Sequence, residues 1–524
     1  MRLQPASTCR APRGAVCAID QLAAQAGLAM LLAGGSAADA AVATSAVLAV
    51  TAQHLCGMGG DLLAIVVPPG SSPLALNASG RAGSGADPDR LRAEGHRIMP
   101  ARGDIRSVTV PGCVDGWLAL HQRFGRLPLE DVLAPAQHYA GNGFPAMPTL
   151  VASIPEVASL PDAADYTLPG PLRPGGVIRR PGVARVLADI AATGRAGFYE
   201  GEFGAGLLKL GAGEFVASDL KTPLADWVPA LGAVGFGHRL WTVPPNTQGY
   251  LTLASAWIAS GLDLPADPDD PGWAHLLIEA SRQAAYDRLD VLYEGADGAA
   301  LLSPPRLLPR QAAIDPDRAT RLGDAYRGGG TIALTVVDND RLGIALLQSN
   351  AAGYGSHLIV PGVRIFLHNR GIGFSLQPGH PAEYRAGRRP PHTLSPTAVT
   401  RADGALVGVL GTMSGDSQPQ ILLQLLARWL RAGESPGPAV AAGRWALAAG
   451  GGFETWRQGG AVRVLVEGQA PSAWKDGLAR RGHEVEELAP FSHSFGHAHL
   501  IAVENDHLAA GTDPRPRSGA AVGY

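Results

Sequence analysis

The feature that most restricts the fold is a period-two pattern in the second half of the chain. It runs over 331–337 and resumes over 342–348, after an Asn-Asp pair at 339 and 340. Two runs with this alternation, joined by so short a turn, predict a β-hairpin. Further strands are expected over 363–367 and 406–410.

The turn also predicts the register of the hairpin. If the loop has two residues, the strands pair so that Thr331 lies opposite Gln348 and next to Ser349. We therefore expect the hydroxyl of Ser349 to reach Thr331.

Helical and strand patterns mix along the rest of the chain and predict an α/β protein. The capping-box spacing of Ser36 and Asp39 marks the start of one helix. Helices are predicted over 17–32, 36–50, 273–293 and 418–431 and over most of 128–210, strands over 62–67 and 74–77, and a strand-helix-strand unit over 461–503.

Composition excludes several classes of protein. Of the 524 residues, 46% are hydrophobic and 17% are charged, which indicates a folded chain rather than a disordered one. The formal net charge of -3 lacks the basic excess that nucleic acid or an anionic membrane would require, so neither is expected as a partner. Four irregularly spaced cysteines, an N-terminus without an apolar signal core and apolar runs too short to span a bilayer predict a cytoplasmic protein with reduced thiols.

Three glycines at 328–330 precede Thr331, and they leave the chain free to form a strained turn before a strand that starts with a hydroxyl. By itself this pattern is more typical of a flexible loop. The functional interpretation is an N-terminal nucleophile, in which Thr331 cleaves the Gly330–Thr331 bond. The new α-amine, with a pKa of about 8, could then accept the hydroxyl proton.

Several motifs, in order along nearly the whole chain, resemble the γ-glutamyltranspeptidase family of N-terminal-nucleophile hydrolases. They are GGSAADAAVA at 34–43, GMGGD at 57–61, ASGR at 78–81, VPG at 110–112, PPNTQG at 244–249, TIALTVVD at 331–338, AGTDPR at 510–515 and GAAVGY at 519–524. The resemblance implies a four-layer αββα sandwich built from one self-cleaving precursor. Its large and small subunits would be residues 1–330 and 331–524, and a higher oligomer is left open.

The resemblance also implies the catalytic residues. Thr331 would be the nucleophile and, with Gly330, the autocleavage site, while Ser349 would orient the new amine. The backbone amides of Ser414 and Gly415 would hold the oxyanion of the tetrahedral intermediate. The implied reaction is acyl transfer from an amide to water or an amine, without a cofactor or a metal.

For the substrate, the resemblance implies a small amide that carries a carboxylate. Arg81 matches the arginine that holds this carboxylate, and His392 and Thr393 replace a Ser-Ser pair that also binds it. Gly373 and Ala351 replace an aspartate and an asparagine, and the aspartate is the residue that grips the glutamyl α-amino group. Two substrate classes therefore stay open: γ-glutamyl amides, and small carboxylated amides without an α-amino group, such as oxamate.

A further alternative is a non-catalytic relative that acts as a binding module, because Ile332 and Ala333 follow the nucleophile where the family often has polar or aromatic residues. Other kinds of site are disfavoured. The GTMSG segment at 411–415 lacks the GxSxG spacing of a serine nucleophile elbow, and the glycines of 57–60 do not form GxGxxG. The histidines at 493, 497 and 499 are more typical of core or loop residues than of a metal cluster.

Overall fold

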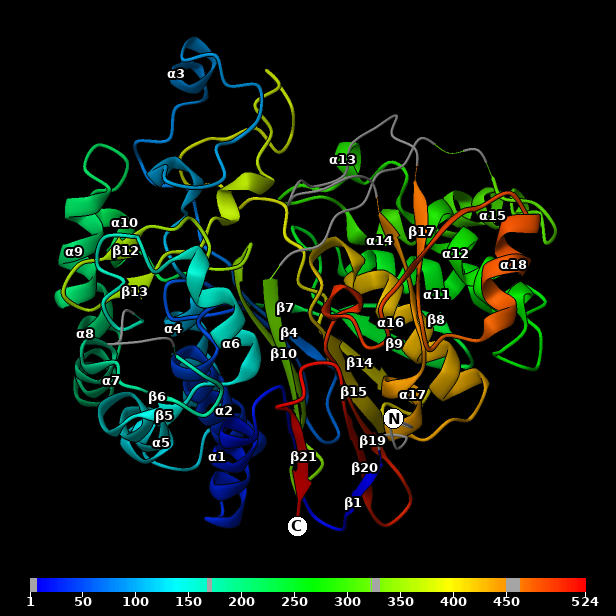
Figure 1. Ribbon diagram of the computed structural model, residues 1–524, viewed down its shortest axis with the longest axis horizontal. Coiled ribbons are helices and arrows are strands. Elements are labelled where there is room, and N and C mark those ends of the chain that lie inside the picture. The colour runs from blue at the N-terminus through cyan, green and yellow to red at the C-terminus, as the bar shows by residue number, and fades with distance from the viewer. Residues whose placement is uncertain (1–6, 167–171, 321, 323–329, 449–461) are drawn as a thin grey trace.

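The structure is a computed structural model that describes residues 7–166, 172–320, 322, 330–448 and 462–524. Two antiparallel sheets of seven strands each lie face to face at its centre, and helices cover the outer face of each sheet (Figure 1). This is a four-layer αββα sandwich, so the predicted fold class is confirmed.

Each sheet combines strands from before and after residue 330. The order in the first sheet is β21 (Ala520–Gly523), β2 (Ala15–Ala18), β10 (Gly330–Val337), β11 (Gly343–Ala351), β3 (Asp61–Val67), β4 (Leu74–Ala78) and β7 (Asp226–Pro229). The order in the second is β1 (Cys9–Ala11), β20 (Leu508–Thr512), β19 (Ala498–Val503), β15 (Leu406–Thr412), β14 (Thr397–Thr400), β9 (His238–Thr242) and β8 (Leu231–Gly235). The segments 1–330 and 331–524 thus share both sheets, while the boundary between them stays a prediction.

Helices form the two outer layers. The first sheet is covered by α1 (Gln21–Leu32), α2 (Ala37–Thr51), α4 (Cys113–Phe124), α5 (Leu129–Asn142) and α7 (Pro181–Thr193), and the second by α11 (Gly249–Ser260), α12 (Pro271–Ala285), α16 (Gln418–Leu426) and α18 (Ser472–Arg480). Shorter helices are α3 (Pro88–Ala93), α6 (Pro148–Ser153), α8 (Arg195–Tyr199), α9 (Glu202–Leu210), α10 (Ala217–Lys221), α13 (Arg288–Val291), α14 (Gly298–Leu301), α15 (Pro304–Ala312) and α17 (Pro436–Ala441). Among the described residues, no helix has the length and apolar character needed to cross a membrane.

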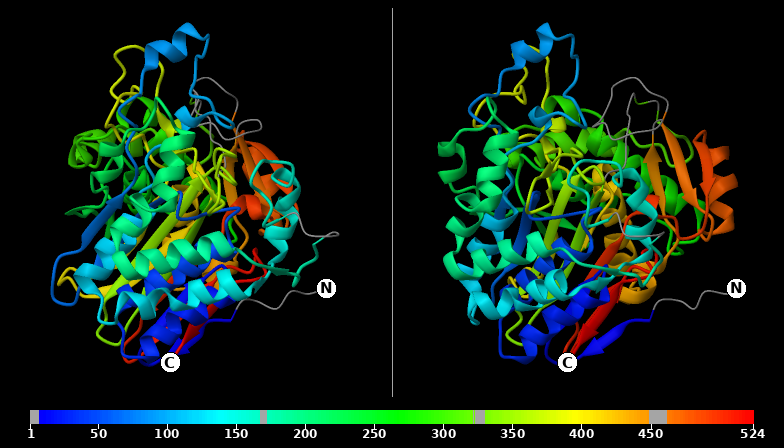
Figure 2. Two further views of the ribbon diagram at one scale, coloured as in Figure 1. Left: turned by 90° about the vertical axis from the view of Figure 1, so that its left-hand side faces the viewer. Right: turned by 60° about the vertical axis from the view of Figure 1, so that its left-hand side comes forward.

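Small additional strands lie outside the central sheets. They are the pairs β5 (Phe144–Pro145) with β6 (Val177–Ile178) and β12 (Ile359–Val360) with β13 (Ile365–Phe366), and a three-stranded sheet of β16 (Trp445–Ala448), β17 (Arg463–Glu467) and β18 (Glu484–Leu488). The helix α3 projects from the molecule beside the segment around residue 380 (Figure 2). Arg92 of α3 fixes this projection, because it donates to the carbonyl of Leu376 at 2.8 Å and pairs with Glu383.

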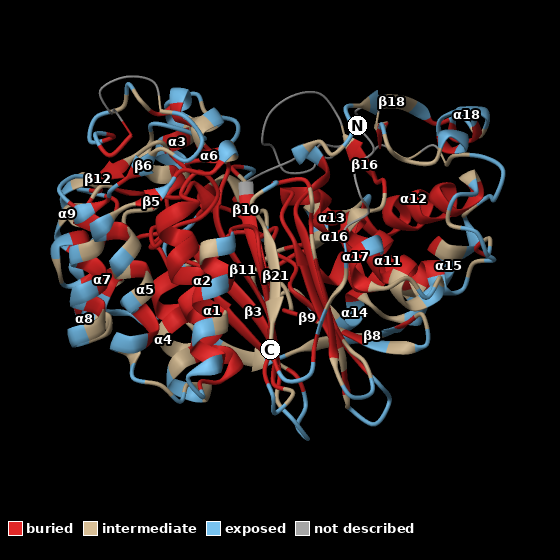
Figure 3. Ribbon diagram, turned by 60° about the horizontal axis from the view of Figure 1, so that its bottom comes forward, coloured by how far each residue is buried: buried red, intermediate tan, exposed pale blue. Residues whose placement is uncertain are grey.

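Side chains of β10 alternate between two separate cores, as the period-two pattern predicts. Ala333 and Val337 pack in the core between the sheets, whereas Ile332, Leu334 and Val336 pack against the helices of the first layer. Figure 3 shows that most strands at the centre are buried, while most exposed residues lie on the helices and loops around them. A strand buried on both sides holds its end residues firmly, and Thr331 is one of them.

The helix α2 begins at the predicted capping box. The Ser36 side chain accepts hydrogen bonds from the amides of Ala38 and Asp39, and the Asp39 carboxylate accepts one from the Ser36 amide. Asp338, at the end of the hairpin strand, accepts a hydrogen bond of 2.8 Å from the Ala37 amide. The hairpin and the helix are therefore joined at the helix N-terminus.

Two predicted helices differ from the structure. The helix predicted over 17–32 begins only at Gln21, because Ala15–Ala18 forms β2 between β10 and β21. Pairing on both sides overrides the helix propensity of this alanine-rich segment. The helix predicted over 273–293 ends at Ala285 and is followed by the separate short helix α13.

The hairpin loop has three residues instead of the predicted two. Arg341 takes a left-handed φ of 67°, which is typical of the last residue in a three-residue hairpin loop. As a consequence Ile332 lies opposite Gln348. The prediction that Thr331 faces Gln348 is therefore wrong by one residue.

A bulge at the start of β10 adds to this shift. Gly330 pairs with Ala351 while Ile332 pairs with Gln348, so the register changes across Thr331. Thr331 is left directly beside Ser349, and their hydroxyl oxygens lie 3.0 Å apart. The predicted contact between Thr331 and Ser349 is confirmed, although the register that suggested it is not.

Candidate active site

The Thr331 and Ser349 hydroxyls form a buried hydrogen-bonded pair at one end of the space between the sheets. The Ser349 oxygen also accepts hydrogen bonds from the Ala351 amide at 2.9 Å and from Nη2 of Arg370 at 3.1 Å. These two donors and the Thr331 hydroxyl hold the Ser349 oxygen in place, and either hydroxyl of the pair can be the donor.

Arg370 is a site residue that the sequence reasoning missed. It begins the short 3-10 helix Arg370–Gly373, and its guanidinium reaches Ser349 with one nitrogen and the Thr393 hydroxyl, at 3.1 Å, with another. Burial lowers its pKa to about 10, against the opposing effect of Asp61, so the side chain is still cationic at neutral pH. A positive charge thus lies two hydrogen bonds from the Thr331 oxygen.

Asp61 neutralises this charge and organises the residues around it. Its carboxylate accepts a hydrogen bond of 2.8 Å from the Gly80 amide, and lies 3.2 Å from His368 Nδ1 and 3.5 Å from Arg370 Nε. Burial by itself would raise the pKa of Asp61, but His368 and His392 outweigh burial and hold the pKa well below its usual range. Asp61 is therefore a buried carboxylate anion next to the site.

The predicted substrate-binding residues His392 and Thr393 lie in this network. Burial, together with Arg370, lowers the pKa of His392 to about 3, so its ring is neutral. Its Nδ1 accepts from the Leu394 amide at 3.2 Å, and its Nε2 therefore carries the hydrogen that is donated to Asp61 at 3.1 Å. Both ring nitrogens of His392 are thus used within the protein, whereas Thr393 contacts Arg370 directly.

Ser414 and Gly415 form the turn in which the oxyanion site is predicted. Both have positive φ angles, 149° and 54°, and the Gln248 amide group donates to the carbonyls of Thr393 and Gly415 at 2.9 and 3.0 Å. Within the described part of the chain, neither the Ser414 amide nor the Gly415 amide donates a hydrogen bond. The Ser414 hydroxyl donates to the Ser494 carbonyl at 3.2 Å, which leaves the backbone as the group that can bind an oxyanion.

Arg81, the predicted carboxylate-binding residue, belongs to a different cluster. Its Nη1 donates to Glu294 at 2.7 Å and to the Gly387 carbonyl at 2.9 Å, and its Nη2 lies 3.7 Å from Asp226. The side chain is 29% exposed, in contrast to the buried Arg370. Two carboxylates already balance its charge, so a substrate carboxylate would have to compete with them.

Gly373 has no room for a side chain. A Cβ atom added there would overlap the carbonyl oxygen of Pro391, which is backbone and cannot turn away. The aspartate that the resemblance would place here to hold an α-amino group is therefore missing from the sequence, and the packing leaves no room for it at this position.

Replacing Asp61 with asparagine is expected to destabilise the protein by about 3 to 5 kcal/mol at pH 7, because the buried Arg370 loses its charge partner. Because the pKa of Asp61 is lowered in the folded state, its stabilising effect is present above about pH 4 and is lost as the pH falls further. The measurement is urea unfolding of the Thr331→Ala chain with and without the Asp61→Asn change. The difference in the free energy of unfolding between the two should be constant from pH 8 to 5 and smaller at lower pH.

The matched control is Asp340→Asn, which breaks a half-exposed pair with Arg126 at 2.6 Å. A surface pair of this kind should contribute less than about 1 kcal/mol. Equal effects of the two asparagine variants would contradict the role assigned to Asp61.

Comparison with known proteins shows which family the chain belongs to. The family profile described as Gamma-glutamyltranspeptidase matches residues 23–524. The chain is 34% identical to the oxamate amidohydrolase proenzyme of Klebsiella pneumoniae, over 98% of both chains. It is 31% identical to the glutathione hydrolase-like YwrD proenzyme of Bacillus subtilis, over 96% of this chain and 97% of the relative.

The structure is also similar to solved structures. The structure superposes on the crystal structure of cephalosporin acylase from Bacillus halodurans with a TM-score of 0.90 and 31% sequence identity, over 100% of this chain and 98% of the other. The non-catalytic alternative is thereby set aside, since the similar proteins carry the names of enzymes. The chain belongs to the γ-glutamyltranspeptidase family, and it is an autoprocessing amide hydrolase of the N-terminal-nucleophile type.

Proposed function

We propose that this enzyme hydrolyses small amides in which a carboxylate lies next to the scissile carbonyl, as in oxamate. The observation that carries the proposal is Arg370, a buried cation joined to Thr331 through Ser349 by hydrogen bonds of 3.1 and 3.0 Å. In oxamate the carboxylate is bonded directly to the amide carbon. In a γ-glutamyl amide three carbon atoms lie between the two groups. A cation this close to the nucleophile suits the shorter substrate.

Substrate charge supports the same choice. A γ-glutamyl substrate brings an ammonium group, and burying it without a partner would be costly. Gly373 cannot supply this partner, because a side chain at this position would overlap the Pro391 carbonyl. Oxamate carries only the negative charge that Arg370 can pair with, preferably through two parallel hydrogen bonds.

In the proposed reaction, maturation at Gly330–Thr331 first frees the α-amine of Thr331. This amine accepts the Thr331 hydroxyl proton as the oxygen attacks the amide carbon, and the amides of Ser414 and Gly415 stabilise the oxyanion. The amine then protonates the leaving ammonia. Water attacks the acyl-enzyme in the same way, which releases the dicarboxylic acid and restores Thr331.

The second candidate is hydrolysis or transfer of a γ-glutamyl group, which would place the enzyme in glutathione metabolism. Arg81 favours it, because this arginine matches the family residue that holds the glutamyl carboxylate. The similarity to a glutathione hydrolase-like proenzyme supports it equally. Its weakness is the cluster of Glu294, Asp226 and Gly387 that already surrounds Arg81.

A series of primary amides of increasing chain length distinguishes the two candidate substrate classes. The series oxamate, malonamate, succinamate and glutaramate moves the carboxylate away from the amide one carbon at a time, and glutamine adds only the α-amino group to glutaramate. Ammonia release should give the highest kcat/KM for oxamate, with a loss of at least about a hundredfold, or about 2.7 kcal/mol, at glutaramate.

Two outcomes of this series would contradict the proposal. A maximum at glutaramate would move the carboxylate site away from Arg370, toward a residue such as Arg81. If glutamine is hydrolysed much faster than glutaramate, another group must bind the α-amine, and the γ-glutamyl assignment is restored.

The cytoplasmic location predicted from the sequence is part of the same proposal. All four cysteines are free thiols, three of them buried, as is usual for proteins of a reducing compartment.

A further inference from the structure

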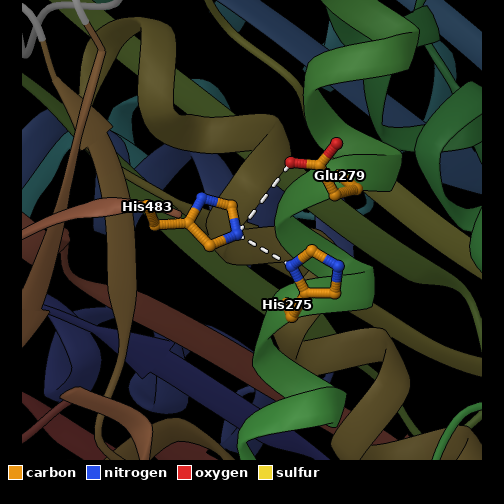
Figure 4. Close-up of side chains that lie close together, drawn as sticks. All are labelled: His275, Glu279 and His483. Atoms are coloured by element: carbon orange, nitrogen blue, oxygen red, sulfur yellow. Dashed lines mark hydrogen bonds and ion pairs between the residues drawn. The ribbon is translucent and has the colours of Figure 1, made fainter. Parts of the chain in front are cut away.

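A second cluster of ionisable side chains lies in the outer helical layer of the second sheet, away from the residues that surround Thr331. His275 and Glu279 project from α12, and His483 lies between α18 and β18 (Figure 4). His275 Nδ1 lies 2.8 Å from His483 Nε2, which lies 4.0 Å from Glu279 Oε1. All three side chains are buried.

The helix sets the geometry on one side of the cluster. His275 and Glu279 are four residues apart on α12 and therefore share one face. His275 donates its Nε2 hydrogen to the Asp315 carbonyl at 2.8 Å, which leaves the Nδ1 lone pair directed at His483. A histidine that is held in this way by a carbonyl is the usual arrangement of a metal ligand.

The electrostatic environment keeps the two histidines neutral, which is the form that binds a metal ion. Burial lowers the pKa of His275 and lowers that of His483 to about 3, so both rings are neutral and keep a lone pair. Glu279 accepts from Arg282 at 3.0 Å and from the Thr320 amide at 3.0 Å, and these donors hold the carboxylate in place.

The distances do not fit a complete hydrogen-bonded network. At 4.0 Å, His483 and Glu279 are too far apart for a hydrogen bond. Two nitrogen or oxygen ligands of a tetrahedral zinc ion are separated by about 3.4 Å, because each bond is about 2.0 to 2.1 Å long. The separations of 2.8 Å and 4.0 Å lie about 0.6 Å on either side of that spacing, and all three ligand atoms lie within 4.8 Å of one another.

We propose that His275, Glu279 and His483 bind a zinc ion, with water in the fourth position. Two imidazoles and a carboxylate are a donor set that suits zinc. In the described part of the chain, this is the one group of His, Cys, Asp and Glu side chains whose ligand atoms converge in this way.

The ion would have a structural role. Two of the three residues also bind the chain that leads to the predicted cleavage site. His275 donates to the Asp315 carbonyl, and Glu279 accepts from the Thr320 amide. Zinc would therefore connect α12, the turn before β18 and residues 315–320 to one another, without taking part in amide hydrolysis.

Metal analysis of the full-length gene product, purified without a histidine tag, tests the proposal directly. Mass spectrometry after gel filtration should find one zinc ion per chain, and added zinc should raise the Tm of metal-stripped protein. Wild-type protein that retains no zinc after incubation with zinc sulfate would overturn the site and leave a histidine pair beside an ion pair.

Variants locate the ion. Glu279→Gln, which keeps the shape of the side chain, and His483→Ala should both lose the zinc and the zinc-dependent rise in Tm. The control is His493→Ala, because His493 and His497 form a similar pair at 2.8 Å, and the described residues place no third ligand beside that pair. Equal zinc content in Glu279→Gln and wild-type protein would place the ion elsewhere and refute the proposal, even if His483→Ala fails to fold.

Discussion

A Thr331→Ala variant is expected to remain a single chain of 524 residues and to have no amidase activity. The wild-type protein should separate on a denaturing gel into residues 1–330 and 331–524, with Thr331 at the N-terminus of the smaller fragment. One hydroxyl serves both reactions, since it attacks the Gly330 carbonyl during maturation and the substrate carbonyl afterwards. Intact-mass analysis of both proteins measures the result.

A Thr331→Ser variant is the matched control, because it keeps the hydroxyl and removes only the methyl group. It should mature more slowly than the wild type and keep some activity. Efficient cleavage of the alanine variant between residues 330 and 331 would exclude Thr331 as the group that cuts the chain.

Ser349→Ala should impair maturation less than Thr331→Ala does. Ser349 orients Thr331 through one hydrogen bond of 3.0 Å and does not itself react. Its loss should slow maturation and leave the cleavage position unchanged.

The sequence was most informative where local pattern and tertiary packing agree. The alternation along β10 predicts a strand with two buried faces, and the structure places Ala333 and Ile332 in different cores. The capping box at Ser36 likewise predicts where α2 begins. Local pattern and tertiary packing disagree at the start of the helix predicted over 17–32. Pairing with β10 and β21 makes Ala15–Ala18 a strand, and helix propensity does not reveal this.

The hairpin register shows a different limit. Loop length decides the register, and a left-handed residue such as Arg341 in the turn is not visible in a pattern of apolar side chains. The three-residue loop shifts the pairing by one residue and by itself brings Thr331 opposite Ser349, and the bulge changes the register only beyond that point, between Ile332 and Gly330. The contact between Thr331 and Ser349 was thus predicted from a register that the structure does not have.

The substrate side of the site depends on contacts between distant segments. Asp61, Arg370 and His392 come from β3, a 3-10 helix and a loop, and no spacing in the sequence relates them. The sequence did show that an aspartate is missing at Gly373. The sequence shows only an arginine three residues before Gly373, and its importance follows from its burial and its contact with Ser349 in the structure.

Replacing Arg370 with glutamine is expected to lower kcat/KM for oxamate by about a thousandfold, or about 4 kcal/mol, because the substrate carboxylate loses its charged partner. Arg370 also touches Ser349, so maturation can slow as well, and activity should be expressed per mature protein. The decisive reading is the ratio of oxamate to oxamide turnover, since oxamide replaces the carboxylate with a neutral amide.

A residue that recognises the carboxylate and a residue that only supports the fold affect this ratio differently. If Arg370 binds the carboxylate, Arg370→Gln should remove the preference for oxamate while oxamide turnover changes little. If Arg370 only positions Ser349, both substrates should slow by the same factor and the preference should survive. Arg81→Gln is the matched control, because its guanidinium is already paired with Glu294 and the change should affect oxamate less than tenfold. A larger loss for Arg81→Gln than for Arg370→Gln would place the carboxylate at Arg81 and favour a longer, γ-glutamyl substrate.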